Sequence, residues 1–236
     1  MLSRRALSVL MLLAVSSCSL RDSACGAPTT GTAPVAITGD ATPDPSASGK
    51  VGIAVLGDSL TAGFGLLSDQ AYPAKIGEMF EAEGYAGVEI DNAGVSADTT
   101  AGGLRRVEQI LTPTTKILVI ALGGNDAIRG LGVNDSRENL RKIIDLGLQH
   151  NALVMLCGME APTNLGEDYR TAFRQMYFDL LRAYQRQIVY VPFLLEGVAG
   201  HAELNQADGI HPNPEGAKKV AAHLFPQLKD MVDRIQ

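Results

Sequence analysis

Tryptophan is absent from this 236-residue sequence, cysteine occurs three times, and aromatic residues make up 5%. Three cysteines are too few for the disulfide framework that stabilises many small secreted domains. Basic residues are also scarce, 20 against 26 acidic ones, for a formal net charge of −6. Because non-specific nucleic-acid binding needs a basic surface, this balance argues against a nucleic-acid partner.

Long apolar runs are missing as well. Residues 7–15 are almost wholly apolar, but the run is too short to span a bilayer. It follows two arginines and precedes two serines, which is the pattern of an export signal. Val15-Ser16-Ser17-Cys18 resembles the lipobox of bacterial lipoproteins, whose cysteine carries the lipid. We therefore expect a lipoprotein-type signal peptide at 1–17, lipidation at Cys18 and a lipoprotein facing the periplasm. A plain secretory signal, giving a soluble periplasmic protein, stays open.

The next segment, 18–49, is rich in Ala, Thr, Ser, Gly and Pro and has no apolar period. This composition is typical of a flexible tether, and it leaves 50–236 as one folded domain, which we expect to be monomeric. Cys25 lies in the tether, and Cys157 ends an apolar run, as a buried small hydrophobe does. A disulfide between these two cysteines stays open as an alternative.

Short apolar segments alternate with segments of helical spacing from residue 51 onward. The predicted strands are 51–56, 88–90, 117–122, 152–157 and 188–193, and the predicted helices are 71–83, 102–111, 136–149, 169–185 and 214–232. Strands that are apolar on both faces and alternate with helices indicate a parallel sheet covered on both sides. The fold class is therefore α/β, a flavodoxin-like three-layer α/β/α sandwich with a five-stranded parallel sheet.

Four polar motifs follow predicted strands. Gly57-Asp58-Ser59-Leu60 comes after the first strand, 92–99 after the second, Gly123-Gly124-Asn125-Asp126 after the third, and 208–212 after the fifth. In open α/β sheets ligands bind outside the carboxyl ends of the strands. These four segments are therefore expected to meet at one edge of the sheet.

Ser59 is the candidate nucleophile, in a turn that Gly57 allows to be tight. A serine needs a base to take its proton, and His211 is the candidate, with Asp208 three residues earlier to hold its ring. The alternative for Ser59 is a helix cap. His150, His201 and His223 have no comparable acidic motif beside them and are interpreted as structural.

Asn125 has an amide that can stabilise a developing oxyanion, although an asparagine after two glycines is also a common turn residue. A metal site is a weaker interpretation. A cluster of Asp58, Asp126, Asp208 and His211 is the candidate, but the sequence lacks HExxH and cysteine-rich spacings. Walker A and dinucleotide-binding motifs are lacking too.

The blocks GDSLTAGFGL, NAGVSADTTAGGL, GGNDAIRG and DGIHPNPEGAKKVA resemble those of the SGNH/GDSL hydrolases. The likeness runs from about 51 to about 228 and is strongest to the periplasmic multifunctional enzymes called arylesterase, thioesterase I or lysophospholipase. It implies a serine esterase with Ser59, His211 and Asp208 as triad and an acyl-enzyme intermediate. It also implies oxyanion donors from the Ser59 backbone, the Asn125 side chain and a backbone N–H of the second block. No metal or organic cofactor is implied, and the substrate would be a small ester, thioester or lysophospholipid.

One position departs from this family pattern. The second-block oxyanion residue is usually a glycine five residues after the asparagine, and Ala97 stands there. A glycine can adopt a positive φ that alanine tolerates poorly, so Gly94 is the alternative donor. Met159, Ala161 and Pro162, after the fourth strand, are expected to line the acyl pocket, although such residues often serve only packing.

Two rival functions remain at this level. One is a carbohydrate O-acetylesterase of the same fold, and the other is a lipoprotein that binds an acyl or glycan ligand without catalysis. The few aromatic residues and the small residues near the loops suggest an open, tolerant site.

Overall fold

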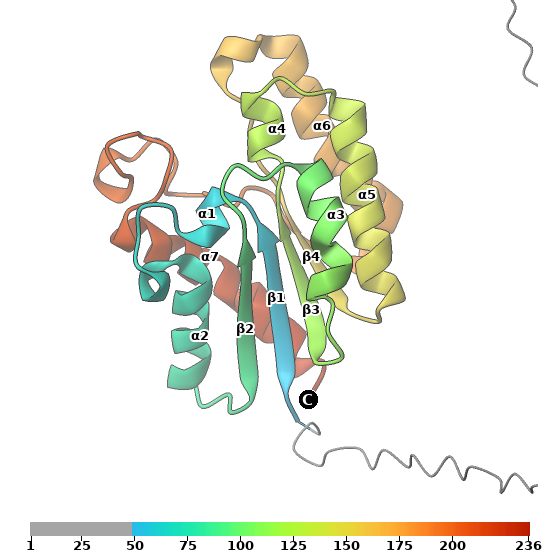
Figure 1. Ribbon diagram of the computed structural model, residues 1–236, viewed down its shortest axis with the longest axis vertical. Coiled ribbons are helices and arrows are strands. Elements are labelled where there is room, and N and C mark those ends of the chain that lie inside the picture. The colour runs from blue at the N-terminus through green and yellow to red at the C-terminus, as the bar shows by residue number, and fades with distance from the viewer. Residues whose placement is uncertain (1–48) are drawn as a thin grey trace, which may run out of the picture. The chain divides into compact units, whose positions relative to one another are not determined.

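The computed structural model describes residues 49–236 (Figure 1). The predicted signal peptide, Cys18, Cys25 and the tether up to residue 48 lie outside the described residues. Within the part that is described, no helix has both the length and the apolar character that crossing a membrane requires.

The core of the domain is a five-stranded parallel sheet in the order β2-β1-β3-β4-β5. The strands are β1 (Val51–Gly57), β2 (Val88–Gly94), β3 (Thr115–Ala121), β4 (Leu153–Cys157) and β5 (Ile188–Val191). Strands β1, β3 and β4 are almost completely buried, as their unbroken apolar sequences predict. The flavodoxin-like prediction is confirmed, since this strand order is the one that defines it.

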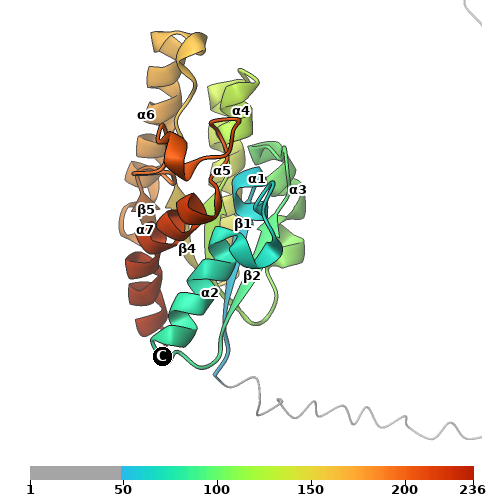
Figure 2. The ribbon, with the colours of Figure 1, turned by 90° about the vertical axis from the view of Figure 1, so that its left-hand side faces the viewer.

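Helices cover the two faces of the sheet (Figures 1 and 2). Helix α2 (Tyr72–Ala82) packs against α7 (Pro214–Asp233) on one face, and α3 (Thr100–Ile110), α5 (Val133–Gln149) and α6 (Glu167–Tyr184) lie on the other. Helices α2, α5, α6 and α7 bury apolar residues at helical spacing; in α5 these include Leu140, Ile143 and Ile144. The predicted boundaries of these helices agree with the structure to within three residues.

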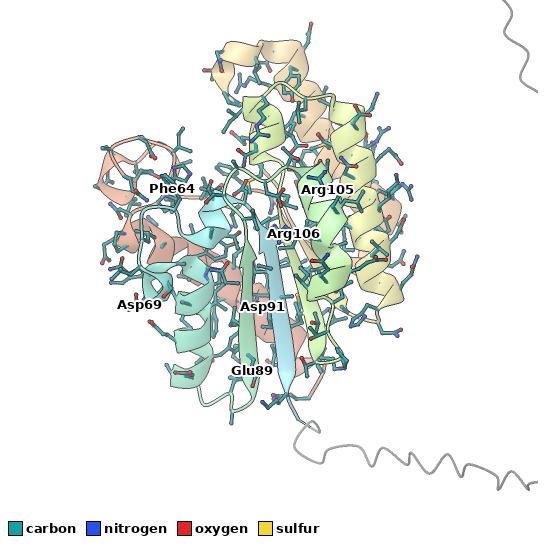
Figure 3. The ribbon with its side chains drawn as sticks, in the orientation of Figure 1. Phe64, Asp69, Glu89, Asp91, Arg105 and Arg106 are labelled. Atoms are coloured by element: carbon teal, nitrogen blue, oxygen red, sulfur yellow. The ribbon has the colours of Figure 1, made fainter. Side chains whose placement is uncertain are left out.

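Strand β2 differs from the prediction in length and in exposure. It extends to Gly94, because its backbone pairs with β1 as far as Gly57. This backbone pairing does not require apolar side chains. Glu89 and Asp91 are exposed along it (Figure 3). The prediction of a sheet covered on both sides holds for the sheet as a whole, but strand β2 is only partly covered. It is an edge strand, and charged side chains on such a strand discourage pairing with other chains.

Other differences also have local causes. Strand β5 ends at Val191 because the next residue, Pro192, has no N–H for the ladder. Two short helices, α1 (Ser59–Ala62) and α4 (Gly124–Ile128), follow β1 and β3 directly. Neither is long enough to show a helical period, which is why the sequence predicts turns there. The same is true of the 3₁₀ turns, which are η1 (Ser68–Gln70), η2 (Thr163–Leu165), η3 (Gln185–Gln187) and η4 (Ala202–Leu204).

Cys157 ends β4 and is completely buried with a free thiol. Burial raises the pKa of this thiol to about 12, so it stays protonated and unreactive at neutral pH. The interpretation of Cys157 as a small core hydrophobe is confirmed.

Candidate active site

Ser59 lies where β1 turns into α1. Asp58 is the N-cap of this short helix, and its Oδ1 accepts a hydrogen bond from the Leu60 N–H at 3.0 Å. The helix-cap interpretation of Ser59 is therefore wrong, because Asp58 has that role. Gly57 does not have a positive φ. It is required for space instead, since a Cβ at residue 57 would lie 1.9 Å from Thr61 Oγ1.

Ser59, His211 and Asp208 form a hydrogen-bonded chain. His211 Nε2 lies 2.9 Å from Ser59 Oγ, and His211 Nδ1 lies 2.7 Å from Asp208 Oδ2. The His211 side chain is 18% exposed and that of Asp208 37%. This arrangement lets the ring accept a proton from the serine while the carboxylate holds its other nitrogen protonated.

Asp208 is held by its own loop. Its Oδ1 accepts hydrogen bonds from the backbone N–H groups of His211 and Ile210, at 3.0 and 2.9 Å. These two bonds, followed by the bond to the His211 ring, lower the pKa of Asp208 to about 2. The carboxylate is therefore ionised throughout the range in which a histidine can act as a base.

The loop that carries His211 is anchored at several points. Asn205 pairs with Pro212 in an isolated β-bridge, and the Gln206 N–H donates to the His211 carbonyl at 2.8 Å. The Gln206 side chain also donates to the carbonyls of Phe64 and Pro212, at 2.6 and 3.0 Å. It thereby ties the histidine loop to the segment that follows Ser59. No sequence pattern indicates this role, because Gln206 belongs to none of the four motifs.

Phe64 is a second residue that the motifs did not single out as functional. Its ring centroid lies 4.7 Å from that of His211. The side chain is 51% exposed and lines the same cleft as Ser59 and His211. Phe64 therefore shields one side of the His211 ring at the mouth of the site.

Ala97 has a φ of 63° and is left-handed. This conformation costs a residue with a Cβ about 1–2 kcal/mol, so other contacts must stabilise the loop after β2. The Arg129 guanidinium donates to the Ala97 carbonyl at 2.7 Å. Within residues 49–236 the N–H of Ala97 has no acceptor. It is therefore available to a ligand.

Gly94, the alternative donor, has a different role. Its N–H donates to Asn92 Oδ1 at 3.0 Å. A Cβ there would lie 2.2 Å from the backbone nitrogen of Ala62. Gly94 is thus required where β2 packs closely against α1, and the structure gives no support to it as the donor.

Asn125 is the second residue of α4 and not a turn residue. Its Nδ2 donates to Asp58 Oδ2 at 3.2 Å. Asp58 is only 2% exposed, and burial raises its pKa from 3.8 to about 6, although the hydrogen bonds from Leu60 and Asn125 and the charge of His211 act in the opposite direction. Asp58 belongs to the first sequence motif, but the motif does not predict that this carboxyl is buried beside Ser59.

These groups open into a cleft of about 620 Å³. Its lining includes Ala97 and the polar residues Asp58, Ser59, Ser96, Asn125, Glu160 and His211. The rest is mainly apolar and includes the predicted Met159, Ala161 and Pro162 together with Leu60, Phe64, Ile128, Phe193, Leu195 and Ile210. The cleft can therefore hold an apolar group beside the Ser59 hydroxyl.

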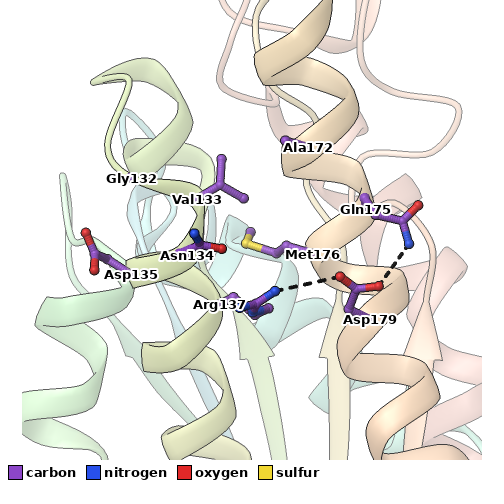
Figure 4. Close-up of a pocket in the computed structure, with 9 residues that line it drawn as sticks. All are labelled: Gly132, Val133, Asn134, Asp135, Arg137, Ala172, Gln175, Met176 and Asp179. Atoms are coloured by element: carbon purple, nitrogen blue, oxygen red, sulfur yellow. Dashed lines mark hydrogen bonds and ion pairs between the residues drawn. The ribbon is translucent and has the colours of Figure 1, made fainter.

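A second cavity, of about 530 Å³, lies between the start of α5 and α6 (Figure 4). Arg137 and Gln175 both face Asp179 there, at 3.8 and 2.9 Å. Neither a serine nor a histidine is among the residues that line it. Its lining therefore offers no serine–histidine pair for acyl transfer.

The hydrogen-bond partners of the Asp126 side chain are Thr100 and Ser136, not residues of the His211 loop. It is buried and accepts hydrogen bonds from the Thr100 N–H and hydroxyl, at 2.9 and 2.6 Å, and from the Ser136 hydroxyl at 2.9 Å. It therefore joins α4 to the first turns of α3 and α5. Across the described range, no three His, Cys, Asp or Glu side chains are grouped as metal ligands.

The other three histidines make local contacts. His150 and His223 bond through Nε2 to the carbonyls of Thr112 and Phe193, and His201 pairs with Glu203. None of them lines the cleft. Their structural interpretation agrees with these contacts.

The opposite pKa shifts of Asp58 and Asp208 predict opposite effects on stability. A carboxyl whose folded pKa is raised contributes most below its unfolded pKa and loses that contribution as pH rises. With a shift from 3.8 to about 6, Asp58 should cost the folded state about 3 kcal/mol at neutral pH. Relative to the wild type, Asp58→Asn should therefore gain about that much unfolding free energy between pH 4 and pH 7, as measured by urea denaturation.

Asp208→Asn is the matched control with the opposite sign. Because the pKa of Asp208 is lowered to about 2, its contribution is present above the unfolded pKa and is lost on acidification. This variant should lose stability relative to the wild type as pH rises from about 2 to about 4. A pH-independent difference for Asp58→Asn would show that Asp58 titrates alike in the folded and unfolded chains.

Comparisons with known proteins show which family this chain belongs to. A model of the GDSL-like Lipase/Acylhydrolase family matches residues 55–219. The esterase TesA of Pseudomonas aeruginosa is 37% identical over 179 residues, which cover 75% of this chain and 88% of that protein. An arylesterase of Vibrio mimicus is 35% identical over 175 residues, 74% of this chain and 86% of the relative.

Thioesterase 1/protease 1/lysophospholipase L1 of Escherichia coli is 31% identical over 180 residues, covering 76% of this chain and 84% of that enzyme. The crystal structure of TesA matches the fold with a TM-score of 0.71 at 35% identity, over 76% of this chain and 99% of that one. The resemblance of the four blocks is confirmed, and the chain belongs to the GDSL-like lipase/acylhydrolase family.

Proposed function

We propose that this protein is a serine esterase that hydrolyses carboxylic esters with an apolar acyl group. The observation that carries the proposal is the hydrogen-bonded chain of Ser59, His211 and Asp208 at the wall of a largely apolar cleft. Family membership supports it, because the relatives are named esterase, arylesterase and thioesterase/lysophospholipase.

The reaction follows from the positions of the two His211 nitrogens. Ser59 Oγ attacks the ester carbonyl while Nε2 takes its proton, and Asp208 stabilises the charged ring through Nδ1. Nε2 then gives the proton to the leaving alkoxide, which departs as an alcohol and leaves an acyl-enzyme. Water attacks this intermediate while Nε2 takes one of its protons; Nε2 then returns that proton to Ser59 Oγ as the carboxylic acid leaves, which regenerates the serine.

Three donors would stabilise the oxyanion of each tetrahedral intermediate. They are the backbone N–H groups of Ser59 and Ala97 and the side-chain amide of Asn125. The free N–H of Ala97 and the position of all three residues on the cleft support this assignment. Donors held in place before the reaction need no reorganisation when the charge appears.

The lining of the cleft favours an acyl chain over an acetylated sugar. Met159, Phe193, Leu195 and Ile210 offer apolar surface beside Ser59, whereas a sugar needs several convergent polar groups. Thioesters and lysophospholipids are also proposed as substrates, because they present the same carbonyl on an apolar chain.

We further propose that the enzyme is exported as a lipoprotein. In this proposal residues 1–17 are removed, Cys18 carries the lipid, and 18–49 tether a monomeric domain of residues 50–236. A tether of about 30 residues reaches roughly 30 Å, which is enough to hold the domain clear of a membrane surface.

Ser59→Ala should abolish esterase activity. Losing an activated serine costs about 10⁶-fold in turnover, while the unfolding free energy should change by less than about 1 kcal/mol. The assay is hydrolysis of p-nitrophenyl esters from acetate to palmitate, with acetylated sugars as a second panel. Labelling of Ser59 by an alkyl fluorophosphonate, read by mass spectrometry, separates an enzyme from a binding protein. Near-wild-type hydrolysis by Ser59→Ala would refute the nucleophile, and a preference for acetylated sugars would refute the substrate class.

The oxyanion donors can be tested separately. Asn125→Ala should lower turnover by about 10²–10³ with a smaller effect on substrate binding, because the donor acts mainly on the transition state. Ala97→Pro removes the N–H and, because proline is restricted to a φ near −65°, also cannot keep the observed φ of 63°, so its effect should be severe. Ala97→Gly is the matched control, since glycine accepts the observed φ and should keep turnover within about tenfold. Equal turnover of the Gly and Pro variants would exclude the Ala97 N–H as a donor.

Mature protein should begin at Cys18 and carry acyl chains. Stable anchoring needs more than one chain, so Cys18→Ser should release the enzyme from membranes. Its specific activity should be unchanged, because the tether separates the anchor from the site. Membrane fractionation and the intact mass of the mature protein are the measurements. A mature chain that starts beyond residue 18 without lipid would instead indicate a soluble periplasmic form.

A further inference from the structure

The carboxylate of Asp58 makes two separate contacts. Oδ1 accepts the Leu60 N–H at 3.0 Å, and Oδ2 accepts Asn125 Nδ2 at 3.2 Å. In the described part of the chain, Asp58 has no ion pair with a lysine or arginine. Asp58 is only 2% exposed. A buried carboxylate is costly for the fold, so its presence beside Ser59 calls for a physical reason.

An N-cap alone does not provide that reason. Serine, threonine and asparagine cap a helix about as well as aspartate and carry no charge into the protein. What an aspartate adds is a second oxygen that only accepts hydrogen bonds. That oxygen faces Asn125, whose amide has one end that donates and another that accepts.

We propose that Asp58 is a positioning residue that fixes the orientation of the Asn125 amide. Because Oδ2 accepts and does not donate, it favours the amide orientation in which Nδ2 points to Asp58. Nδ2 has two N–H groups, so one stays available to the cleft that Asn125 lines. In the flipped orientation the amide oxygen of Asn125 would face Asp58 Oδ2, and the two acceptors would repel each other. This inference rests on the proposed esterase function.

The Asp58 carboxylate also connects the two helices that carry Ser59 and Asn125. Its Oδ1 holds the first turn of α1, which begins with Ser59, and its Oδ2 holds α4, which carries Asn125. A tetrahedral intermediate joins Ser59 Oγ to the oxyanion, so the donor must keep a set distance from the nucleophile. Asp58 couples the two elements through one rigid group.

Asp58→Asn separates the two roles. The variant keeps an amide oxygen for the Leu60 N–H, so the helix cap remains. It places an NH₂ group opposite Asn125 Nδ2, and two donors then face each other. Asp58→Ser is the second variant, because it can cap the helix but does not reach Asn125.

The test is a double-mutant cycle on p-nitrophenyl butyrate hydrolysis with Asp58→Asn, Asn125→Ala and the double variant. Asp58→Asn should lower kcat about 10- to 100-fold, a large part of what one oxyanion donor provides, while KM changes less than about threefold. The double variant should be no slower than Asn125→Ala alone, because the two residues act as a unit. Asp58→Ser should give the same non-additivity and replaces Asp58→Asn if that variant does not fold.

Each outcome decides between distinct conclusions. If the effects multiply in the double variant, or if Asp58→Asn has wild-type kcat, Asp58 does not act through Asn125 and the inference is overturned. If the wild-type enzyme hydrolyses no ester in the panel, the proposed function itself fails. Multiplicative effects in an active wild-type enzyme would remove only the positioning role.

Discussion

The site depends on the parallel pairing of β1 with its two neighbours. This pairing sets Gly57 opposite Gly94 on β2 and opposite Ala121 on β3, so three strands end at the same level. The segments that follow them carry Ser59, Ala97 and Asn125, which would otherwise be far apart along the chain. Both close approaches need glycine, since a Cβ at Gly57 or Gly94 would collide with α1. The relative positions of the catalytic segments therefore depend first on backbone hydrogen bonds and on the two glycines.

Two residues of the site lower the stability of the folded state. Asp58 is a buried carboxylate with a raised pKa, and Ala97 is an alanine with a positive φ. Both are features that packing alone would remove, and such strain is typical of functional sites. The surrounding structure supplies the compensation. Arg129 donates to the Ala97 carbonyl, and Arg106 binds Asp98 and the carbonyls of Ala93 and Gly57. Asp58 accepts hydrogen bonds from the Leu60 N–H and from Asn125.

The histidine loop is built on a different principle, because no strand delivers it. Asp208 and His211 are fixed by local hydrogen bonds, by the cap of Asn213 on α7 and by the Gln206 side chain that reaches back to Phe64. A base three residues from its acidic partner can be aligned within one loop, but its distance to Ser59 depends on contacts across 152 residues of sequence. Gln206 and Phe64 provide such contacts on the exposed side of the site.

The sequence by itself determined the strand and helix order, the apolar core, and the residue types that can carry acyl transfer. These follow from periodicity, from turn residues and from the short spacing of Asp208 and His211, all of which are local properties. Tertiary structure decided the extension of β2 to Gly94, the exposure of Glu89 and Asp91, the packing role of Gly94 and the free N–H of Ala97. It also decided that Asp126 joins helices and that Asp58 faces Asn125. The physical reason is that hydrogen-bond partners, steric space and desolvation arise between segments remote in sequence, and a linear pattern does not contain them.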